Sequence, residues 1–412
     1  MTAGPCRFCG TALEHSFCDL GLAPLSNAFL DASQLQEVEP FYPLHAYVCG
    51  RCFLVQLREF ESPRQIFSEH YAYFSSYSDT WLDHARTYTD EMIHRFNFGP
   101  ASMVVEIASN DGYLLQYFKR RNVPVLGIEP AQNCAQAALQ AGIPTLVKFF
   151  GAELAAELKA QDKGADLLLG NNVLAHVPSL NDFVKGLKIL LKPQGVITME
   201  FPHLLNLMRE NQFDTIYHEH FSYFSFYTVE KIFARHGLKL FDVEELPTHG
   251  GSLRIFGAHA EDQAKATTGR VAELLDKEMR HGVADLRTYA DFTDRVKRAK
   301  RKLLDFLIKA KGDGETVVGY GAPAKGNTLL NYCGVRSDFV GYTVDRSPHK
   351  QGKFLPGSHI PIFHPDRIRD TRPDYLLILP WNIKEEVMSQ MAYVRQWGAK
   401  FVIPIPEPKV LP

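Results

Sequence analysis

The sequence predicts an α/β protein made of three domains, and three observations support this. The length of 412 residues exceeds that of an ordinary single domain. Two CxxC pairs lie near the start of a segment that has no long helical periodicity. Beyond it, short apolar runs alternate with helical patterns in two separate stretches. We expect a small metal-binding domain over 1–70, a larger α/β domain over 71–260 and a second α/β domain over 261–412.

The N-terminal domain is predicted to hold a structural zinc ion. Its candidate ligands are Cys6, Cys9, Cys49 and Cys52, in the contexts CRFCG and CGRC. Four thiolates suit tetrahedral Zn²⁺, and a site closed in this way leaves no position open for a substrate. The other three cysteines have no matching spacing, and we expect them to be ordinary semi-buried residues.

The central domain is predicted to begin with a helix over 78–97, because its apolar residues recur at helical spacing. Strands are then predicted at MVVEIA, VLGIEP, DLLLGNNVLAH and VITMEF. The stretches between them, LLQYFKRR, AQNCAQAALQAG and FVKGLKILLKPQG, have the pattern of helices. Alternation of this kind indicates a parallel sheet with helices on both faces.

The C-terminal domain is predicted to follow one or two long amphipathic helices over 265–311. The alternation of strands and helices then restarts at TVVGYGAPAKGNTLLNYC and continues through FVGYTVD, YLLILPWN and KFVIPIP. This indicates a second and smaller strand-and-helix unit, which we expect to be another Rossmann-like domain.

The loop after the first central strand is the candidate cofactor site. It runs from Glu106 to Gly112, and its small residues let the backbone approach a ligand. Glu129 follows the second strand, where a carboxylate can accept hydrogen bonds from ribose hydroxyls. The GxGxxG array that a dinucleotide needs is missing, whereas S-adenosylmethionine (SAM) has no phosphates to cradle. The loop resembles the first motif of class I methyltransferases, with Glu106 and Asp111 as its acidic members.

The segment YHEHFSYF is the candidate catalytic segment. It follows FPHLL, where the carboxyl edge of the sheet and its ligand crevice are expected. It lacks the HExxH pattern of zinc proteases. We favour catalysis over a purely structural role for His220 and its neighbours Tyr217 and Glu219. Methylation of a carbon next to a ketone requires a base such as His220 and donors that stabilise the enolate. Glu219 is expected to orient His220.

Several motifs together resemble one family. The CxxC pairs, ExxSNDG, GIEP, NNVLAH, YHEHFSYFS, HGGSLR and YGAPAKGNT are similar to the C-methyltransferases of deoxysugar biosynthesis. The resemblance spans essentially the whole chain. It implies transfer of a methyl group from SAM to a ring carbon, C3, of a nucleotide-linked 4-keto-6-deoxysugar, commonly dTDP-linked, through an enolate.

The resemblance also implies roles for individual residues. His220 would be the general base, with Tyr217 and Glu219 beside it. Ala108 departs from the Gly that many methyltransferases have in the cofactor loop. Cofactor-binding residues would be Tyr71, Ser75, Glu106, Asn110, Asp111, Gly112, Glu129, Pro130, Asn171 and Asn172. Substrate-binding residues would be His176, His249, Gly250, Tyr320 and Lys325, with Lys325 meeting a diphosphate.

Composition bears on partners and location. Lys+Arg number 45 against Asp+Glu 47, a net charge of -2, which argues against a nucleic-acid partner. The basic stretch 295–302 is expected to be a solvated helix face. No apolar run reaches the roughly 20 residues that cross a bilayer, and no export signal stands at the start. We expect a cytoplasmic monomer or weak homodimer. The alternatives are a zinc-ribbon RNA-modifying methyltransferase, a sugar O- or N-methyltransferase, and a non-catalytic nucleotide-sugar binder.

Overall fold

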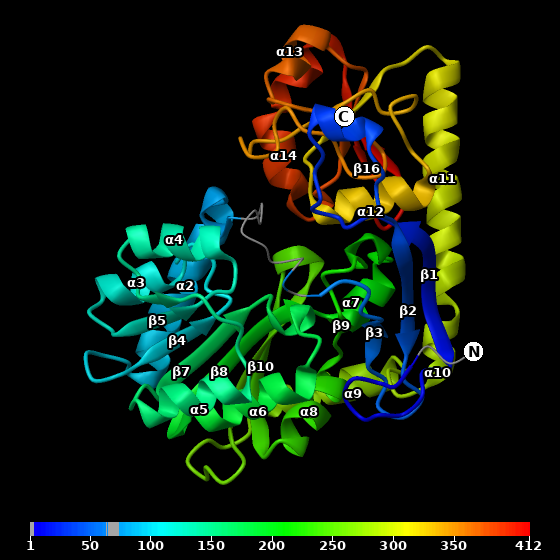
Figure 1. Cartoon of the computed structure of the whole chain (residues 1–412). Helices are drawn as coiled ribbons and strands as arrows, with labels where there is room; N and C mark the ends of the chain where they lie inside the picture. Colours follow the sequence, from blue (N-terminus) through cyan, green and yellow to red (C-terminus); the bar gives the residue numbers. More distant parts are fainter. Residues whose placement is uncertain (1–3, 63, 65–73) are drawn as a thin grey trace.

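The computed structural model describes residues 4–62, 64 and 74–412. In this part of the chain the backbone forms three sheets of four, seven and six strands. Figure 1 shows the seven-stranded sheet with its helices on one side of the molecule, and the N-terminal strands and the C-terminal unit on the other. The α/β class that the sequence predicted is confirmed.

The N-terminal sheet is antiparallel and contains a strand from the central part of the chain. Its strands, in spatial order, are β1 (His15–Ala23), β2 (Tyr42–Val48), β3 (Val55–Leu57) and β9 (Ser222–Tyr223). Val55 pairs with Tyr223 and Gln56 pairs with Ser222. Because β9 begins two residues after His220, the N-terminal sheet directly supports the candidate catalytic segment.

The central sheet has seven strands. In spatial order they are β10 (Leu238–Leu246), β11 (Ser252–His259), β8 (Leu191–Pro202), β7 (Ala165–Asn171), β4 (Val104–Ile107), β5 (Val125–Ile128) and β6 (Thr145–Leu146). β11 runs antiparallel to both of its neighbours, and the other pairs are parallel. The strands predicted from the short apolar runs are all present.

Helices cover both faces of this sheet. One face packs against α5 (Ala152–Ala160), α6 (Leu180–Leu190) and α8 (Phe226–Arg235). The other face packs against α2 (Asp79–Phe96), α3 (Leu115–Arg120) and α4 (Gln132–Gln140). A short helix, α7 (Leu204–Arg209), follows β8.

Helix α2 illustrates how the local sequence sets an element and its orientation. The Ser78 side chain accepts a hydrogen bond from the backbone N–H of Trp81 and caps the helix. Asn97 ends it in the left-handed conformation, with φ of 54°. Trp81, Ala85 and Met92 are buried at helical spacing, so this face packs on the sheet. The prediction of a helix over 78–97 is confirmed.

The C-terminal unit has a six-stranded sheet preceded by helices. The helices are α9 (Gly269–Arg280), α10 (Leu286–Ala290) and α11 (Phe292–Gly312). The strands, in spatial order, are β14 (Ile362–Phe363), β13 (Thr343–Val344), β12 (Val317–Tyr320), β15 (Tyr375–Ile378), β16 (Lys400–Ile403) and β17 (Lys409–Leu411). The remaining helices are α12 (Ala324–Cys333), α13 (Arg367–Thr371) and α14 (Lys384–Gln390).

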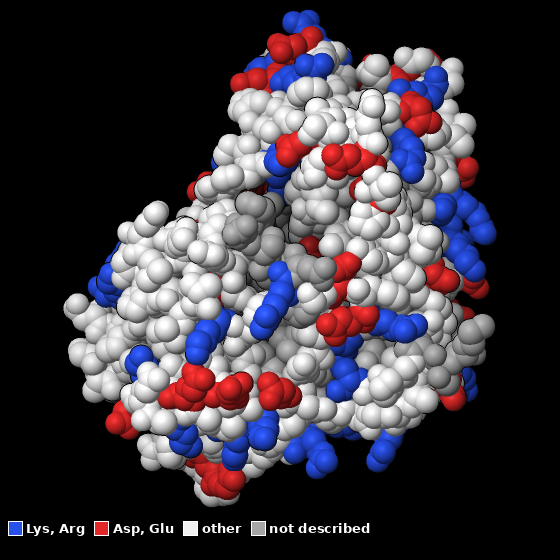
Figure 2. All heavy atoms as spheres, viewed as in Figure 1, with Lys and Arg blue, Asp and Glu red and all other residues white. Residues whose placement is uncertain are grey.

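Helix α11 joins the N-terminal and C-terminal parts into one hydrophobic core. Its buried residues, Val296, Leu303 and Leu307 among them, pack in a cluster that includes the N-terminal strands and the C-terminal sheet. In Figure 1 it lies alongside β1. The basic residues of 295–302 include exposed Lys297 and Arg298, and Figure 2 shows basic side chains gathered along this edge. The prediction of a solvated helix face is therefore confirmed.

None of the helices in the described part of the chain combines the length and apolar character that a membrane crossing requires.

Candidate active site and zinc centre

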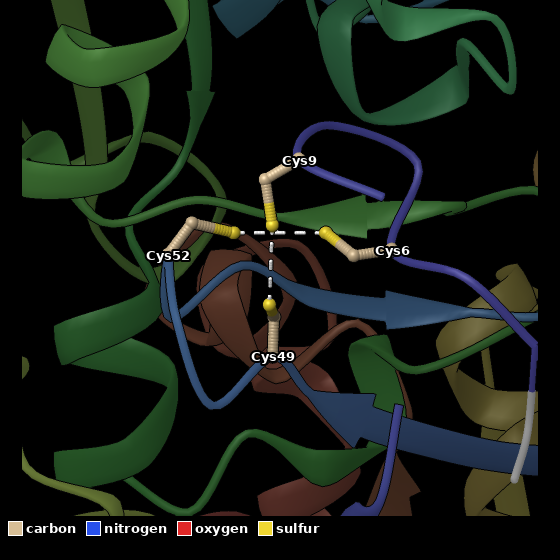
Figure 3. Close-up of side chains that lie close together, drawn as sticks. All are labelled: Cys6, Cys9, Cys49 and Cys52. Carbon is tan, nitrogen blue, oxygen red and sulfur yellow. Dashed lines mark hydrogen bonds between the residues drawn. The ribbon is translucent and has the colours of Figure 1, made fainter. Parts of the chain in front are cut away.

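The four predicted zinc ligands converge on one point. The Sγ atoms of Cys6 and Cys52 lie 3.6 Å apart, and those of Cys9 and Cys49 lie 3.5 Å apart. All four sulfur atoms lie within 4.8 Å of one another (Figure 3). A Zn–S distance of about 2.3 Å in a tetrahedron corresponds to sulfur–sulfur distances of about 3.8 Å, so the four thiolates fit zinc.

The zinc centre is tied to the strand that supports the candidate catalytic segment. Gln56, in β3, donates from Nε2 to the Sγ atom of Cys6 at 3.1 Å. Its Oε1 atom accepts a hydrogen bond from the backbone N–H of Arg7 at 2.9 Å. The same residue pairs with Ser222 in β9. Gln56 thus joins the zinc loop, through its side chain, to the strand after His220, through its backbone.

A cavity of about 1630 Å³ lies at the carboxyl ends of β4, β5 and β7 and reaches the C-terminal unit. This is the edge at which open α/β sheets bind ligands. The structure brings most of the predicted site residues to its wall. They are Ser75, Asn110, Glu129, Pro130, Asn171, Asn172, His176, Tyr217, Glu219, His220, His249 and Lys325.

The candidate cofactor loop makes a sharp turn after β4. Ala108, Asn110 and Gly112 have φ values of 57°, 51° and 79°. Ala108 therefore adopts a left-handed conformation, in which a Cβ atom costs roughly 1 kcal/mol or more. The Glu129 carboxylate accepts hydrogen bonds from the backbone N–H groups of Asn110 at 2.9 Å and Ala131 at 2.8 Å. Burial raises the pKa of Glu129 to about 7.

The same loop holds the segment that precedes α2. The backbone N–H of Ser75 donates to Oδ1 of Asn110 at 2.9 Å, and that of Ser76 donates to Oδ2 of Asp111 at 3.1 Å. Two side chains of the candidate cofactor loop thus hold this segment against the cavity. Tyr71, the other predicted cofactor residue of this stretch, lies outside the described residues.

Some predicted cofactor residues lie behind the cavity wall. Glu106 is buried within β4, and burial raises its pKa well above the usual range, with Asp111 and Glu129 adding to the rise. Asp111 is also buried. A Cβ atom on Gly112 would lie 2.9 Å from Ile143, so glycine is required there by packing. We infer that these residues shape the turn.

Two predicted substrate residues also lie off the cavity wall. Tyr320 faces a second cavity of about 460 Å³, and its hydroxyl donates to Oε1 of Gln390 at 3.0 Å. Gly250, with φ of 90°, packs against the Trp381 ring. The structure therefore separates Tyr320 from the other predicted substrate residues and gives Gly250 a packing position beside them.

His220 is oriented by two hydrogen bonds. Its Nδ1 atom lies 2.9 Å from the carbonyl oxygen of Thr215, and its Nε2 atom lies 2.8 Å from the Tyr217 hydroxyl. Because a carbonyl oxygen only accepts, Nδ1 carries the proton and Nε2 is the basic nitrogen of the neutral ring. Burial lowers the pKa of His220 well below its usual value, and nearby His176 lowers it further. The ring is therefore neutral at pH 7.

The expectation that Glu219 orients His220 is wrong. The Oε1 atom of Glu219 accepts a hydrogen bond from Nδ2 of Asn27 at 2.6 Å, and the Thr215 carbonyl orients His220 instead. Burial raises the pKa of Glu219 to about 7. A peptide carbonyl near the histidine replaces the carboxylate that the sequence suggested.

Most of the other cavity residues carry no local sequence signal. Asn27 comes from the N-terminal part, Trp81 from α2, and Lys350 and Asn382 from the C-terminal unit. They are brought together by packing between parts of the chain that are far apart in sequence. For Trp81 alone, burial at helical spacing after the Ser78 cap was a usable signal.

The cavity also holds His249 in a defined position. Its Nε2 atom lies 3.0 Å from Nδ2 of Asn172, and the Trp81 ring packs edge-on at 5.2 Å between ring centroids. Burial, together with the positive charge of Lys325, lowers the pKa of His249 to about 4. Two neutral imidazoles, those of His220 and His249, thus face the same space.

Three family models match successive parts of the chain. Residues 6–67 match a model described as "Putative zinc binding domain", residues 81–243 match a methyltransferase domain, and residues 247–406 match a C-methyltransferase C-terminal domain. Together with the sheet and the four thiolates, they define a SAM-dependent C-methyltransferase with a class I methyltransferase domain and a zinc-binding domain.

The comparison with curated proteins identifies the family. The chain is 37% identical over 406 residues to C-methyltransferase NovU from Streptomyces niveus, covering 98% of this chain and 96% of the relative. This chain belongs to that C-methyltransferase family, as its motifs predicted.

Solved structures show partial similarity to the chain. One is the PH0226 protein from Pyrococcus horikoshii, 15% identical with a TM-score of 0.38, covering 48% of this chain and 99% of that one. Another is the 1,6-didemethyltoxoflavin-N1-methyltransferase from Burkholderia thailandensis, 15% identical with a TM-score of 0.37, covering 50% of this chain and 95% of that one.

Proposed function

We propose that this C-methyltransferase acts on C3 of a dTDP-linked 4-keto-6-deoxysugar, and that His220 removes the ring proton. The observation that supports this most strongly is the series of hydrogen bonds from Tyr217 through His220 to the Thr215 carbonyl, at the wall of the large cavity. A volume of about 1630 Å³ exceeds the roughly 300–1,000 Å³ of an ordinary ligand pocket. It suits a nucleotide sugar beside a second large ligand.

The proposed chemistry begins with a proton transfer to His220. Its Nε2 atom accepts the C3 proton, which is acidic because the neighbouring ketone delocalises the carbanion as an enolate. Nδ1 donates to the Thr215 carbonyl throughout, so the imidazolium is stabilised as it forms. Nε2 has a single lone pair, so the Tyr217 hydroxyl must turn away from it before the C3 proton arrives, and this hydroxyl can then donate to the enolate oxygen.

SAM, when bound, supplies an electrophilic methyl group for the enolate carbon. On the protein side, Glu129, Asn171 and Asn172 line the part of the cavity after β5 and β7, where we propose that they bind the cofactor. Lys325 approaches from the C-terminal unit, and His176 packs edge-on against His220 at 4.7 Å between ring centroids. We assign these two residues to the substrate.

The substrate is tested by incubation with a panel of dTDP-4-keto-6-deoxysugars and isotopically labelled SAM. Mass spectrometry detects methyl transfer, and NMR of the product identifies the methylated atom. We expect a new C–CH₃ group at C3. A methyl group on oxygen, or no transfer to any sugar of the panel, would refute the proposal.

The base is tested by exchange of the C3 proton in D₂O. His220→Asn should abolish both exchange and transfer while SAM affinity stays within about twofold of wild type, because the asparagine cannot accept the proton. His281→Asn, at an exposed position, is the matched control and should behave as wild type. Wild-type exchange rates in the His220 variant would exclude His220 as the base.

A further inference from the structure

A buried carboxylate lies directly beside the residue that orients His220. Asp214 is in η4 (Phe213–Thr215) and has no exposed surface. Its Oδ2 atom accepts a hydrogen bond at 2.6 Å from Nε1 of Trp381, which belongs to η6 (Trp381–Ile383) of the C-terminal unit. A hydrogen bond from an indole N–H to a buried carboxylate is charge-assisted and stronger than one between two neutral groups. This bond therefore fixes the C-terminal unit against the catalytic segment.

The ring of Trp381 in turn contacts Lys325. The Nζ atom lies 4.5 Å from the ring centroid, which is within the range of a cation–π interaction. Nζ also donates to Oδ1 of Asn382 at 2.8 Å. A lysine ammonium has three N–H donors, so this leaves two for other partners. Within the described residues no carboxylate lies at ion-pair distance from Nζ, although Lys325 lines the cavity.

We propose that Asp214 and Trp381 are positioning residues for Lys325, whose ammonium group binds an anionic oxygen of the substrate. The short helix η4 would then orient both the His220 ring and the Lys325 ammonium group. Thr215 orients the base through its carbonyl, and Asp214 holds the cation through Trp381. The anionic oxygen belongs to the enolate or to the diphosphate. The substrate in this inference rests on the proposed function, whereas the positioning does not.

The charge of Lys325 already acts on the candidate base. Burial and His176 lower the pKa of His220 most, and the positive charge of Lys325 adds to the decrease. A cation at that position favours an anion in the same cavity. An enolate that forms beside His220 would therefore be stabilised by Lys325 at the stage when the base becomes positively charged.

The test removes the indole N–H that binds Asp214. Trp381→Phe keeps an aromatic ring beside Lys325 but loses the donor to Asp214, and Trp397→Phe is the matched control, because its Nε1 donates to the Pro373 carbonyl at 3.0 Å away from the cavity. We expect Trp381→Phe to lower kcat/KM at least tenfold and Lys325→Met at least a hundredfold. The double variant should be no worse than Lys325→Met, and Trp397→Phe should match wild type.

The kinetic parameters show whether Lys325 binds the enolate oxygen or a diphosphate oxygen. If Lys325 binds the enolate, kcat and the rate of C3 proton exchange fall while the Kd of dTDP is unchanged. If it binds the diphosphate, KM and the Kd of dTDP rise while kcat is retained. Wild-type kinetics for Trp381→Phe, or losses that add fully in the double variant, would overturn the inference.

The positioning is also measured without any sugar. Acetylation of Lys325 by acetic anhydride, followed by peptide mass spectrometry, should be several-fold faster in Trp381→Phe than in wild type or Trp397→Phe. If the wild-type protein methylates no keto-sugar but this difference is found, the proposed function fails and the positioning stands. Equal labelling in the three proteins would overturn the positioning itself.

Discussion

At the scale of single residues, desolvation determines the charge state of the cavity. Burial lowers the pKa of His176 and His249 to about 4 and raises that of Glu129 and Glu219 to about 7. The histidines are therefore neutral at pH 7 and able to accept a proton. The two carboxyls are only partly ionised, so they would repel an anionic ligand less strongly than two full negative charges.

The pKa of Glu219 predicts a pH-dependent stability. Its folded value of about 7 lies above the unfolded value of 4.5, so its stabilising contribution is fully present below pH 4.5 and is lost as the pH rises through 7. Glu219→Gln cannot ionise and keeps an oxygen for Asn27. The free energy of unfolding of Glu219→Gln, relative to that of wild type, should therefore rise by up to about 3 kcal/mol between pH 4.5 and pH 8.5.

Urea denaturation at several pH values measures this difference. Glu14→Gln, at an exposed position before β1, should follow wild type throughout the range. A constant offset between wild type and Glu219→Gln at all pH values would show that Glu219 ionises normally in the folded protein.

At the scale of elements, one carboxylate of α9 stabilises the start of α8. Glu278 is buried, and its Oε1 atom accepts hydrogen bonds from the backbone N–H of Phe226 at 2.7 Å and from Nε2 of His203 at 2.6 Å. Its Oε2 atom accepts from the N–H of Tyr227 at 2.8 Å. The first N–H groups of a helix lack partners within the helix, and a negative charge there is favourable.

Glu278→Gln should therefore be strongly destabilising. The glutamine amide has a donor where the carboxylate has an acceptor, so a buried N–H of α8 or of the His203 ring loses its partner. This should lower the free energy of unfolding by about 3 kcal/mol. Thermal and urea denaturation measure this. Glu273→Gln, an exposed change on the same helix, should shift the midpoints little. Similar midpoints for the two variants would contradict the capping role.

Gly250 connects two elements by close packing. A Cβ atom there would lie 2.6 Å from Cη2 of Trp381, and φ is 90°. Gly314 also has positive φ, 79°, but nothing lies within 4 Å of its Cβ position. Both alanine variants meet similar backbone strain, of the order of 1 kcal/mol. Only Gly250→Ala displaces Trp381, so it alone should lose activity, at least tenfold in a methyl-transfer assay. Equal activities would contradict this.

At the scale of the whole molecule, the zinc centre and the candidate active site are connected through shared strands. The path runs from Cys6 through Gln56 in β3 to β9, which follows the candidate catalytic segment. A closed thiolate site contributes folding free energy directly. Loss of zinc should therefore disturb His220 although the metal takes no part in the chemistry.

Cys49→Ser tests this connection. We expect it to lose its zinc, unfold at lower temperature and retain less than a tenth of the wild-type methyl-transfer activity. Metal content by mass spectrometry and calorimetry measure the first two effects. Cys18→Ala, a buried change outside the cluster, should keep one zinc per chain. Full activity in a zinc-free protein would show that the two sites are independent.

The sequence by itself determined the features that depend on neighbours in the chain. The CxxC spacing identified Cys6, Cys9, Cys49 and Cys52, because each pair forms one local turn around a metal. Periodicity identified α2 and the parallel strands, and the ends of those strands indicated the candidate cofactor loop. The carboxyl ends of parallel strands must meet at one edge, so most of the candidate site followed from local patterns.

Only the tertiary structure decided which groups act on those residues. The Thr215 carbonyl, rather than Glu219, orients His220, Asn27 binds Glu219, and Trp381 joins Asp214 to Lys325. The tertiary structure also decided that β9 pairs with β3 and that Tyr320 lies away from the main cavity. The physical reason is that these contacts, and the burial that shifts the pKa values, arise when distant segments pack together, which no local pattern specifies.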